Sequence, residues 1–132
     1  MGKNSSNQLR YTIRNLSNNN QLASNARLTT STWQRVRGLL GQPQLTIGEG
    51  VIIDHCRSVH TFGMTYPIDV AFVDRNLFII HMIHSMKPCR MSRFLWRAVT
   101  AIELPAGTLL LTGNAVGCRL TFEPKIFGAV SP

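Results

Sequence analysis

The stretch "IDVAFVDRNLFIIHMI", residues 68–83, decides the fold class of this 132-residue chain. Residues 68–73 and 77–83 are rich in Val, Ile and Phe, which is typical of β-strands, and the "DRN" between them suits a hairpin loop. Further strand patterns bounded by turn residues occur at 51–53, 98–104 and 118–122. The sequence therefore predicts a mainly β (α+β) protein, a single compact sandwich or barrel-like domain of six or seven short strands.

One helix is predicted over about residues 31–41, within "TSTWQRVRGLLG". Ser31 or Thr32 is a good N-cap, apolar residues recur on one face at helical spacing, and Gly41 ends the helix. We expect this helix to pack on the sheet. A second segment, "TLLLTGNAVG" at residues 108–117, fits either a single helical turn or a bent strand.

Composition divides the chain into three parts. Residues 1–22 are dominated by Asn, Ser and Gln and are predicted to form a mostly disordered tail, although "YTIRNL" at 11–16 could form a short strand. Residues 23–123 are predicted to be one β-rich domain. Residues 124–132 are predicted to be a C-terminal tail.

The bulk properties narrow the class of protein. Fourteen Lys and Arg against six Asp and Glu give a net charge of +8, which attracts polyanions. Three widely spaced cysteines give no disulfide framework, and no apolar run approaches the roughly 18 to 20 residues that a membrane helix needs. We expect a soluble, cytoplasmic protein. Without a glycine-rich phosphate loop or a nucleotide fingerprint, no cofactor is predicted.

The segment "CRSVHTFGM", residues 56–64, places polar side chains inside an apolar region. In an extended strand, Cys56, Ser58 and His60 would line one face, with Val59 and Thr61 on the other. Cys56 and His60 would then lie about 13 Å apart, beyond hydrogen-bond reach, whereas Ser58 and His60, about 6.6 Å apart, could touch.

A nucleophile needs a base that a third group orients, and Asp69 or Asp54 could orient His60. A hydrolase-like site using Ser58 or Cys56 with His60 is therefore one hypothesis. His55, Cys56 and His60 also offer metal-ligand chemistry, but a closed zinc site takes four ligands in two close pairs, so no metal site is predicted.

Asp69 lies in a strand that is apolar on both faces, so its carboxylate must be hydrogen-bonded. We expect it to accept backbone N–H bonds from the "HTFGM" loop, with His60 or Thr61 as a further donor, and so to pin that loop. Glu103 is a second carboxylate in an apolar strand, and it could face the Asp69 region or an Arg. The predicted polar centre, structural or ligand-binding, consists of Ser58, His60, Thr61, Asp69 and Glu103.

The densest basic cluster is "KPCRMSRFLWR", residues 87–97, in which cations alternate with Phe94 and Trp96. Such a mixture suits single-stranded nucleic acid, whose bases stack on aromatic rings while its phosphates pair with cations. The alternative is a solvated loop whose aromatic residues anchor it to the core. The candidate polyanion-binding residues are Lys87, Arg90, Arg93, Trp96 and Arg97.

Three motifs, "RGLLG" (37–41), "SVHTFGMTYPIDVAFVD" (58–74) and "IELPAG" (102–107), carry a family resemblance. In this order and spacing the chain resembles domain of unknown function 192, a family of small bacterial and archaeal proteins, over roughly residues 27–122. The resemblance implies a compact, mainly β domain and no established activity, substrate or cofactor. The chain departs from the family after Gly117, where it has Cys118 and many members have Asp.

These observations favour a binding or accessory module over an enzyme. The binding surface would be a pocket or groove beside the "CRSVHTFGM" segment, and its partner a small ligand. The alternatives are nucleic-acid or polyanion binding through residues 87–97, and the hydrolase-like site of Ser58 or Cys56 with His60.

Overall fold

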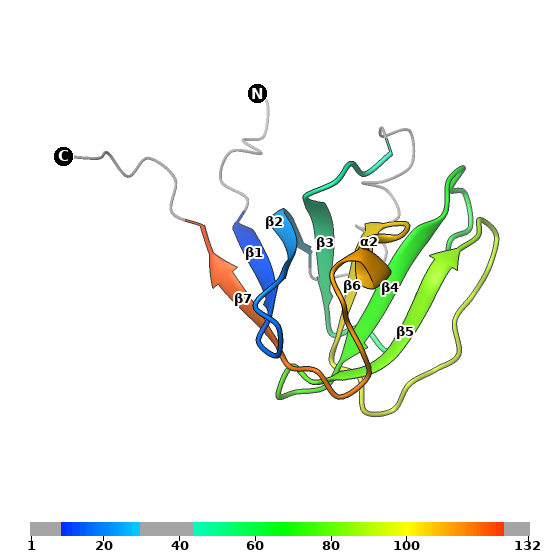
Figure 1. Ribbon diagram of the computed structural model, residues 1–132. Helices are drawn as coiled ribbons and strands as arrows, with labels where there is room; N and C mark the ends of the chain where they lie inside the picture. Colours follow the sequence, from blue (N-terminus) through cyan, green and yellow to red (C-terminus); the bar gives the residue numbers. More distant parts are fainter. Residues whose placement is uncertain (1–8, 30–43, 126–132) are drawn as a thin grey trace, which may run out of the picture.

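The computed structural model describes residues 9–29 and 44–125, in which seven strands form one mixed sheet (Figure 1). The elements are β1 (Arg10–Asn15), β2 (Gln21–Thr29), β3 (Glu49–Asp54), β4 (Ile68–Val73), β5 (Ile79–Met86), β6 (Thr100–Pro105), α2 (Thr108–Leu111) and β7 (Leu120–Pro124). The strand order is β5-β4-β6-β3-β2-β1-β7, and β2–β3 is the parallel pair. The predicted helix at 31–41 lies outside the described residues.

The predicted hairpin forms between β4 and β5. Asp74 stabilises its turn, because Oδ1 accepts backbone N–H bonds from Asn76 (2.9 Å) and Phe78 (3.0 Å). The mainly β class is therefore confirmed, and residues 108–111 of "TLLLTGNAVG" form the helical turn α2.

The sheet curls into a half-barrel. Its two edge strands, β5 and β7, approach each other where β5 and β7 begin. The backbone N–H of Ile79 donates to the Cys118 carbonyl, and that of Leu120 to the Leu77 carbonyl, at 2.8 and 2.9 Å. α2 lies inside the curl over β4 and β6, with Leu109 completely buried (Figure 1).

The two faces of the sheet bury different side chains. The inner face includes Ile52, Ala71 and Leu104 and packs on Leu109 of α2. The outer face includes Val51, Val70 and Phe72, and it is covered by residues from the β3–β4 and β5–β6 connections, among them Cys56, Val59, Leu95 and Ala98. Both faces are thus buried over the central strands, which explains why every residue of β4 except Asp69 is apolar.

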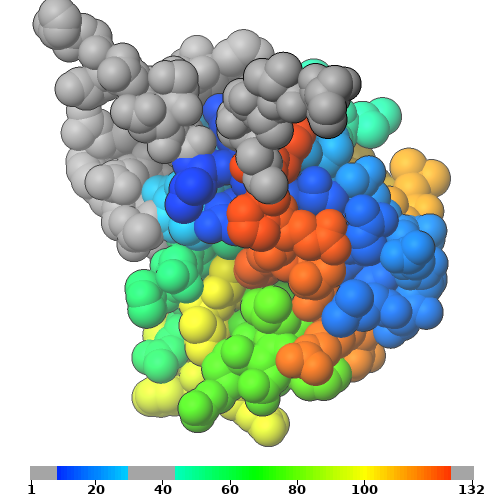
Figure 2. Space-filling view, turned by 90° about the vertical axis from the view of Figure 1, so that its left-hand side faces the viewer, coloured from blue at the N-terminus to red at the C-terminus, as the bar shows by residue number. Residues whose placement is uncertain are grey.

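The prediction that residues 1–22 form a mostly disordered tail is wrong over the second half of that range, where the possible short strand at 11–16 does form. β1 and the start of β2 lie within it, and β1 sits between β2 and β7. Asn18 and Asn20 lie in the turn between β1 and β2, and their side-chain amides donate hydrogen bonds to the Thr112 carbonyl at 3.0 and 3.1 Å. The asparagines thus attach the hairpin to the chain after α2, and Figure 2 shows this N-terminal hairpin packed beside β7.

No helix among the described residues is both long and apolar enough to cross a bilayer.

Candidate functional site

Two segments that are separate in the sequence form one surface on the outer face of the sheet. The β3–β4 connection runs beside the β5–β6 connection, joined by backbone bonds from Leu95 N to Arg57 O, Ser92 N to Val59 O, and Thr61 N to Arg90 O, each 2.9 Å. His60 and Met91 form an isolated β-bridge between them. We call residues 55–62 and 87–97 the basic-aromatic surface, because it unites the "CRSVHTFGM" motif with the basic loop.

Thr61 fixes this pairing from inside. Its side chain is completely buried, and its Oγ1 donates to the Lys87 carbonyl at 2.6 Å and accepts from the Arg90 N–H at 2.9 Å. The prediction that Thr61 donates to Asp69 is therefore wrong. Its hydroxyl instead forms hydrogen bonds with the backbone of the basic loop.

Asp69 is completely buried, as predicted, but it pins a different part of the chain. Oδ1 accepts the Ser85 N–H at 2.8 Å, and Oδ2 accepts those of Gly107 and Leu109 at 3.1 and 2.9 Å. Asp69 thus holds the start of α2 and the end of β5, and the predicted bonds to the "HTFGM" loop are not the ones formed. The reason is the pleat: Val70 faces the outer layer, so Asp69 faces the interior of the curl.

Glu103 lies on the opposite side of the sheet from Asp69. In the register of β6, Glu103 is beside Val51 and Val70, both of which belong to the outer layer, whereas Asp69 is beside Leu104 of the inner layer. The predicted polar centre is therefore divided between two faces. Burial, and secondly the charge of Glu103, raise the pKa of Tyr66 above its ordinary value of 10.0, so this phenol stays neutral at pH 7.

The Cys56–His60 segment is not the alternating strand that was predicted. Cys56 and Val59 both face the core, at 2% and 1% exposure, and the Cys56 thiol donates to the Ser58 carbonyl at 3.0 Å. His60 stacks on Phe62, with ring centroids 4.9 Å apart, and its Nδ1 accepts the Phe62 N–H at 3.4 Å.

The acids proposed to orient His60 have other roles. Both oxygens of Asp69 accept backbone bonds on the far side of the sheet. Asp54 accepts the N–H of His55 at 3.0 Å and lies 3.3 Å from the Thr100 hydroxyl. The arrangement therefore does not provide the predicted oriented base. Among the described residues, no three His, Cys, Asp or Glu side chains are grouped closely enough to hold a metal ion.

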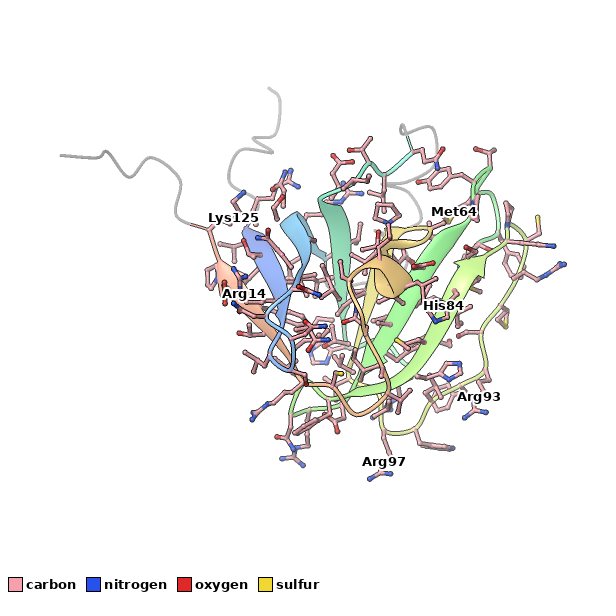
Figure 3. All side chains as sticks on the ribbon, in the orientation of Figure 1. Arg14, Met64, His84, Arg93, Arg97 and Lys125 are labelled. Atoms are coloured by element: carbon pink, nitrogen blue, oxygen red, sulfur yellow. The ribbon has the colours of Figure 1, made fainter. Side chains whose placement is uncertain are left out.

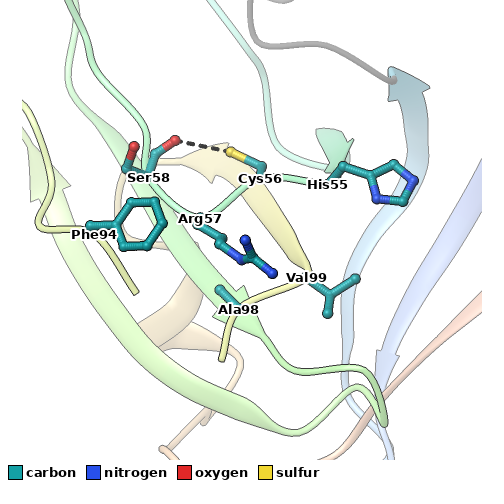
Figure 4. Close-up of a pocket in the computed structure, with 7 residues that line it drawn as sticks. All are labelled: His55, Cys56, Arg57, Ser58, Phe94, Ala98 and Val99. Carbon is teal, nitrogen blue, oxygen red and sulfur yellow. Dashed lines mark hydrogen bonds between the residues drawn. The ribbon is translucent and has the colours of Figure 1, made fainter. Parts of the chain in front are cut away.

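A pocket of about 380 Å³ opens beside the motif (Figure 4). Its lining includes buried Cys56 and Ala98, exposed Phe94, and Arg57, which supplies a cation. The lining residues are His55, Cys56, Arg57, Ser58, Phe94, Ala98 and Val99. Sequence reasoning placed a pocket beside this motif but did not select Arg57, whose position between Cys56 and Ser58 was the available signal.

The basic loop is anchored by apolar residues other than its large aromatic ones. Leu95 and Ala98 are buried in the outer layer, whereas Phe94 and Trp96 are 53% and 78% exposed and pack edge to face, with ring centroids 5.0 Å apart. The alternative in which the aromatic residues anchor the loop is therefore wrong.

The cations of the surface are also exposed. Within residues 9–29 and 44–125, none of them forms an ion pair with a carboxylate. They are Arg57, Lys87, Arg90, Arg93 and Arg97. Burial, and secondly the charge of Arg93, lower the pKa of His81 on β5 below its ordinary value of 6.5, so His81 stays neutral at pH 7.

These features define a small half-barrel domain with an exposed basic-aromatic surface and a pocket within it. The chain belongs to the DUF192 family, described as "Uncharacterized ACR", which matches residues 14–122. The resemblance is thus confirmed and extends further towards the N-terminus than the sequence motifs indicated. No curated protein matches the chain.

Two solved structures share the fold. One is a protein of Sinorhizobium meliloti 1021 described as a "putative transcription regulator", with 23% identity, a TM-score of 0.72, and coverage of 92% of this chain and 98% of that one. The other is a protein of unknown function from Novosphingobium aromaticivorans DSM 12444, with 16% identity, a TM-score of 0.73, and coverage of 92% and 90%. At these identities the similarity establishes the fold alone.

Proposed function

We propose that this protein is a binding module for polyanionic ligands and that the basic-aromatic surface is its binding face. The observation that carries the proposal is the backbone pairing of residues 57–61 with 90–95, which brings the polar motif and the basic loop onto one face. Its exposed cations are then available to an incoming anion, because no described carboxylate neutralises them.

The fixed backbone supports the same proposal. A ligand meets cations whose main chain is already held by the Thr61 hydroxyl and by buried Leu95, so binding does not have to order the backbone of the basic loop. The expected signature is a Kd that rises steeply with salt, because binding releases counterions from the polyanion.

The test compares two double variants that remove the same net charge. Arg93→Gln with Arg97→Gln alters the surface, whereas Arg14→Gln with Lys125→Gln alters the side that carries β1 and β7 (Figure 3). Binding to a labelled polyanion is measured by fluorescence anisotropy over a salt series.

We expect the surface variant to lose affinity and to lower the salt slope by roughly one to two, because each phosphate contact contributes about 0.7 to 0.9. The control variant should keep most of the slope. Equal losses in both variants would mean that net charge alone attracts the ligand and would overturn the proposal.

A further inference from the structure

We infer that the polyanion is single-stranded nucleic acid and that the pocket beside Phe94 holds one of its bases, an inference that rests on the proposed function and makes it specific. Phe94 carries the argument, because it both lines the pocket and forms the exposed edge-to-face pair with Trp96. A single strand can therefore place one base in the pocket and the next on the exposed rings.

The exposed aromatic rings distinguish among polyanions. A polyphosphate has charge but no face to stack, a sulfated polysaccharide offers only saturated sugar rings and no aromatic planes, and a duplex hides its base faces within the helix. For such ligands the rings of Phe94 and Trp96 would contribute less than they do to an aromatic base. A single strand presents both phosphates and open base faces, so it uses the cations and the rings together most fully.

The pocket has the chemistry of a nucleobase site. Its lining combines buried Cys56 and Ala98 and the exposed ring of Phe94 with polar or charged groups at His55, Arg57 and Ser58. A volume of about 380 Å³ is near the lower end of the roughly 300 to 1,000 Å³ typical of ligand pockets, which suits one nucleotide. The Arg57 guanidinium can donate two parallel bonds to a base edge or a phosphate.

Hydrogen bonds made by the lining residues also hold the pocket in shape. The Cys56 thiol is engaged by the Ser58 carbonyl, and the Arg57 carbonyl accepts the Leu95 N–H at 2.9 Å. These bonds fix the spacing between the motif and the Phe94 wall, so the space for a flat ring exists before a ligand arrives.

The experiment measures binding of four labelled probes by anisotropy: oligothymidylate of about twelve nucleotides, an abasic deoxyribose-phosphate strand of equal length, a DNA duplex and heparin. We expect the oligonucleotide to bind at least roughly tenfold more tightly than the abasic strand, because only the former can stack. Phe94→Ala should weaken oligonucleotide binding by roughly 5- to 150-fold and leave the abasic strand unchanged.

Two control variants exclude indirect effects. Phe94→Tyr keeps a stacking ring and should retain oligonucleotide binding, and Phe78→Ala removes another exposed aromatic residue, one that lies beneath the Arg119 guanidinium, and should have no effect. Equal binding of oligonucleotide and abasic strand, or a duplex bound as tightly as the single strand, would overturn this inference while leaving the proposed function intact. Failure of all four probes to bind would instead remove the proposed function itself.

Discussion

Replacing Asp69 with Asn tests the buried carboxylate that accepts three backbone N–H bonds. The side chain keeps its size, but one oxygen becomes an NH₂ group, which donates and cannot accept. If NH₂ replaces Oδ1, it faces the Ser85 N–H; if it replaces Oδ2, it faces those of Gly107 and Leu109. The less costly orientation therefore loses one accepted bond and places two donors against each other.

The magnitude follows from these bonds. A hydrogen bond to a charged group contributes about 1.5–3 kcal/mol, and a neutral one about 0.5–1.5 kcal/mol. Asp69→Asn loses one charged bond outright and weakens two more, while it relieves the cost of burying a charge. We expect a net loss of about 2–4 kcal/mol in the free energy of unfolding, and a larger loss of about 3–5 kcal/mol for Asp69→Ala.

Urea denaturation followed by circular dichroism measures this loss, and the chain supplies a matched control. Asp74 also accepts two backbone N–H bonds, but in the solvated β4–β5 turn, where water can replace a lost bond. Asp74→Asn should therefore cost less than about 1 kcal/mol. If Asp69→Asn were no more destabilising than Asp74→Asn, the role assigned to the Asp69 carboxylate in holding α2 would be refuted.

Two further predictions concern the outer face. Thr61→Val should lower the free energy of unfolding, measured by urea denaturation, by about 1–3 kcal/mol, because the Lys87 carbonyl and the Arg90 N–H lose their buried partner. Thr61→Ser keeps the hydroxyl and should lose much less. A Val variant as stable as the parent would contradict this. The unfolding free energy should also fall as pH drops below about 6.5, since His81 takes up its proton first in the unfolded chain, where its pKa is not lowered. Arg93→Gln should raise the pKa of folded His81 in an NMR titration, and an unchanged value would exclude the influence of that charge.

Local patterns predicted the central part of the fold. β4 and β5 could be assigned because their apolar runs flank a turn in which Asp74 bonds to neighbouring N–H groups, and these interactions are short in sequence. β1 was predicted only as a possible short strand within a mostly disordered tail, because an Asn-rich composition usually signals disorder. Here the amides of Asn18 and Asn20 donate to a carbonyl more than ninety positions away, and such a contact cannot be predicted from local composition.

The site was predicted in pieces that the sequence could not join. Burial of Asp69 followed from its apolar neighbours, but its partners depend on which side of the pleat it occupies, and that requires the register with Leu104. The pairing of residues 57–61 with 90–95 joins irregular segments about thirty positions apart, which have no hydrophobic period to reveal them.

The exposed rings of Phe94 and Trp96 on the outer face of the sheet are not needed to stabilise the fold. The basic-aromatic surface is held in shape by backbone bonds, by Thr61 and by buried Leu95 and Ala98, so the fold does not require the rings of Phe94 and Trp96. Exposed rings of this size leave apolar area in water without adding to the core. A ligand that covers them would recover that free energy, and the unneutralised guanidinium groups beside them favour an anionic one.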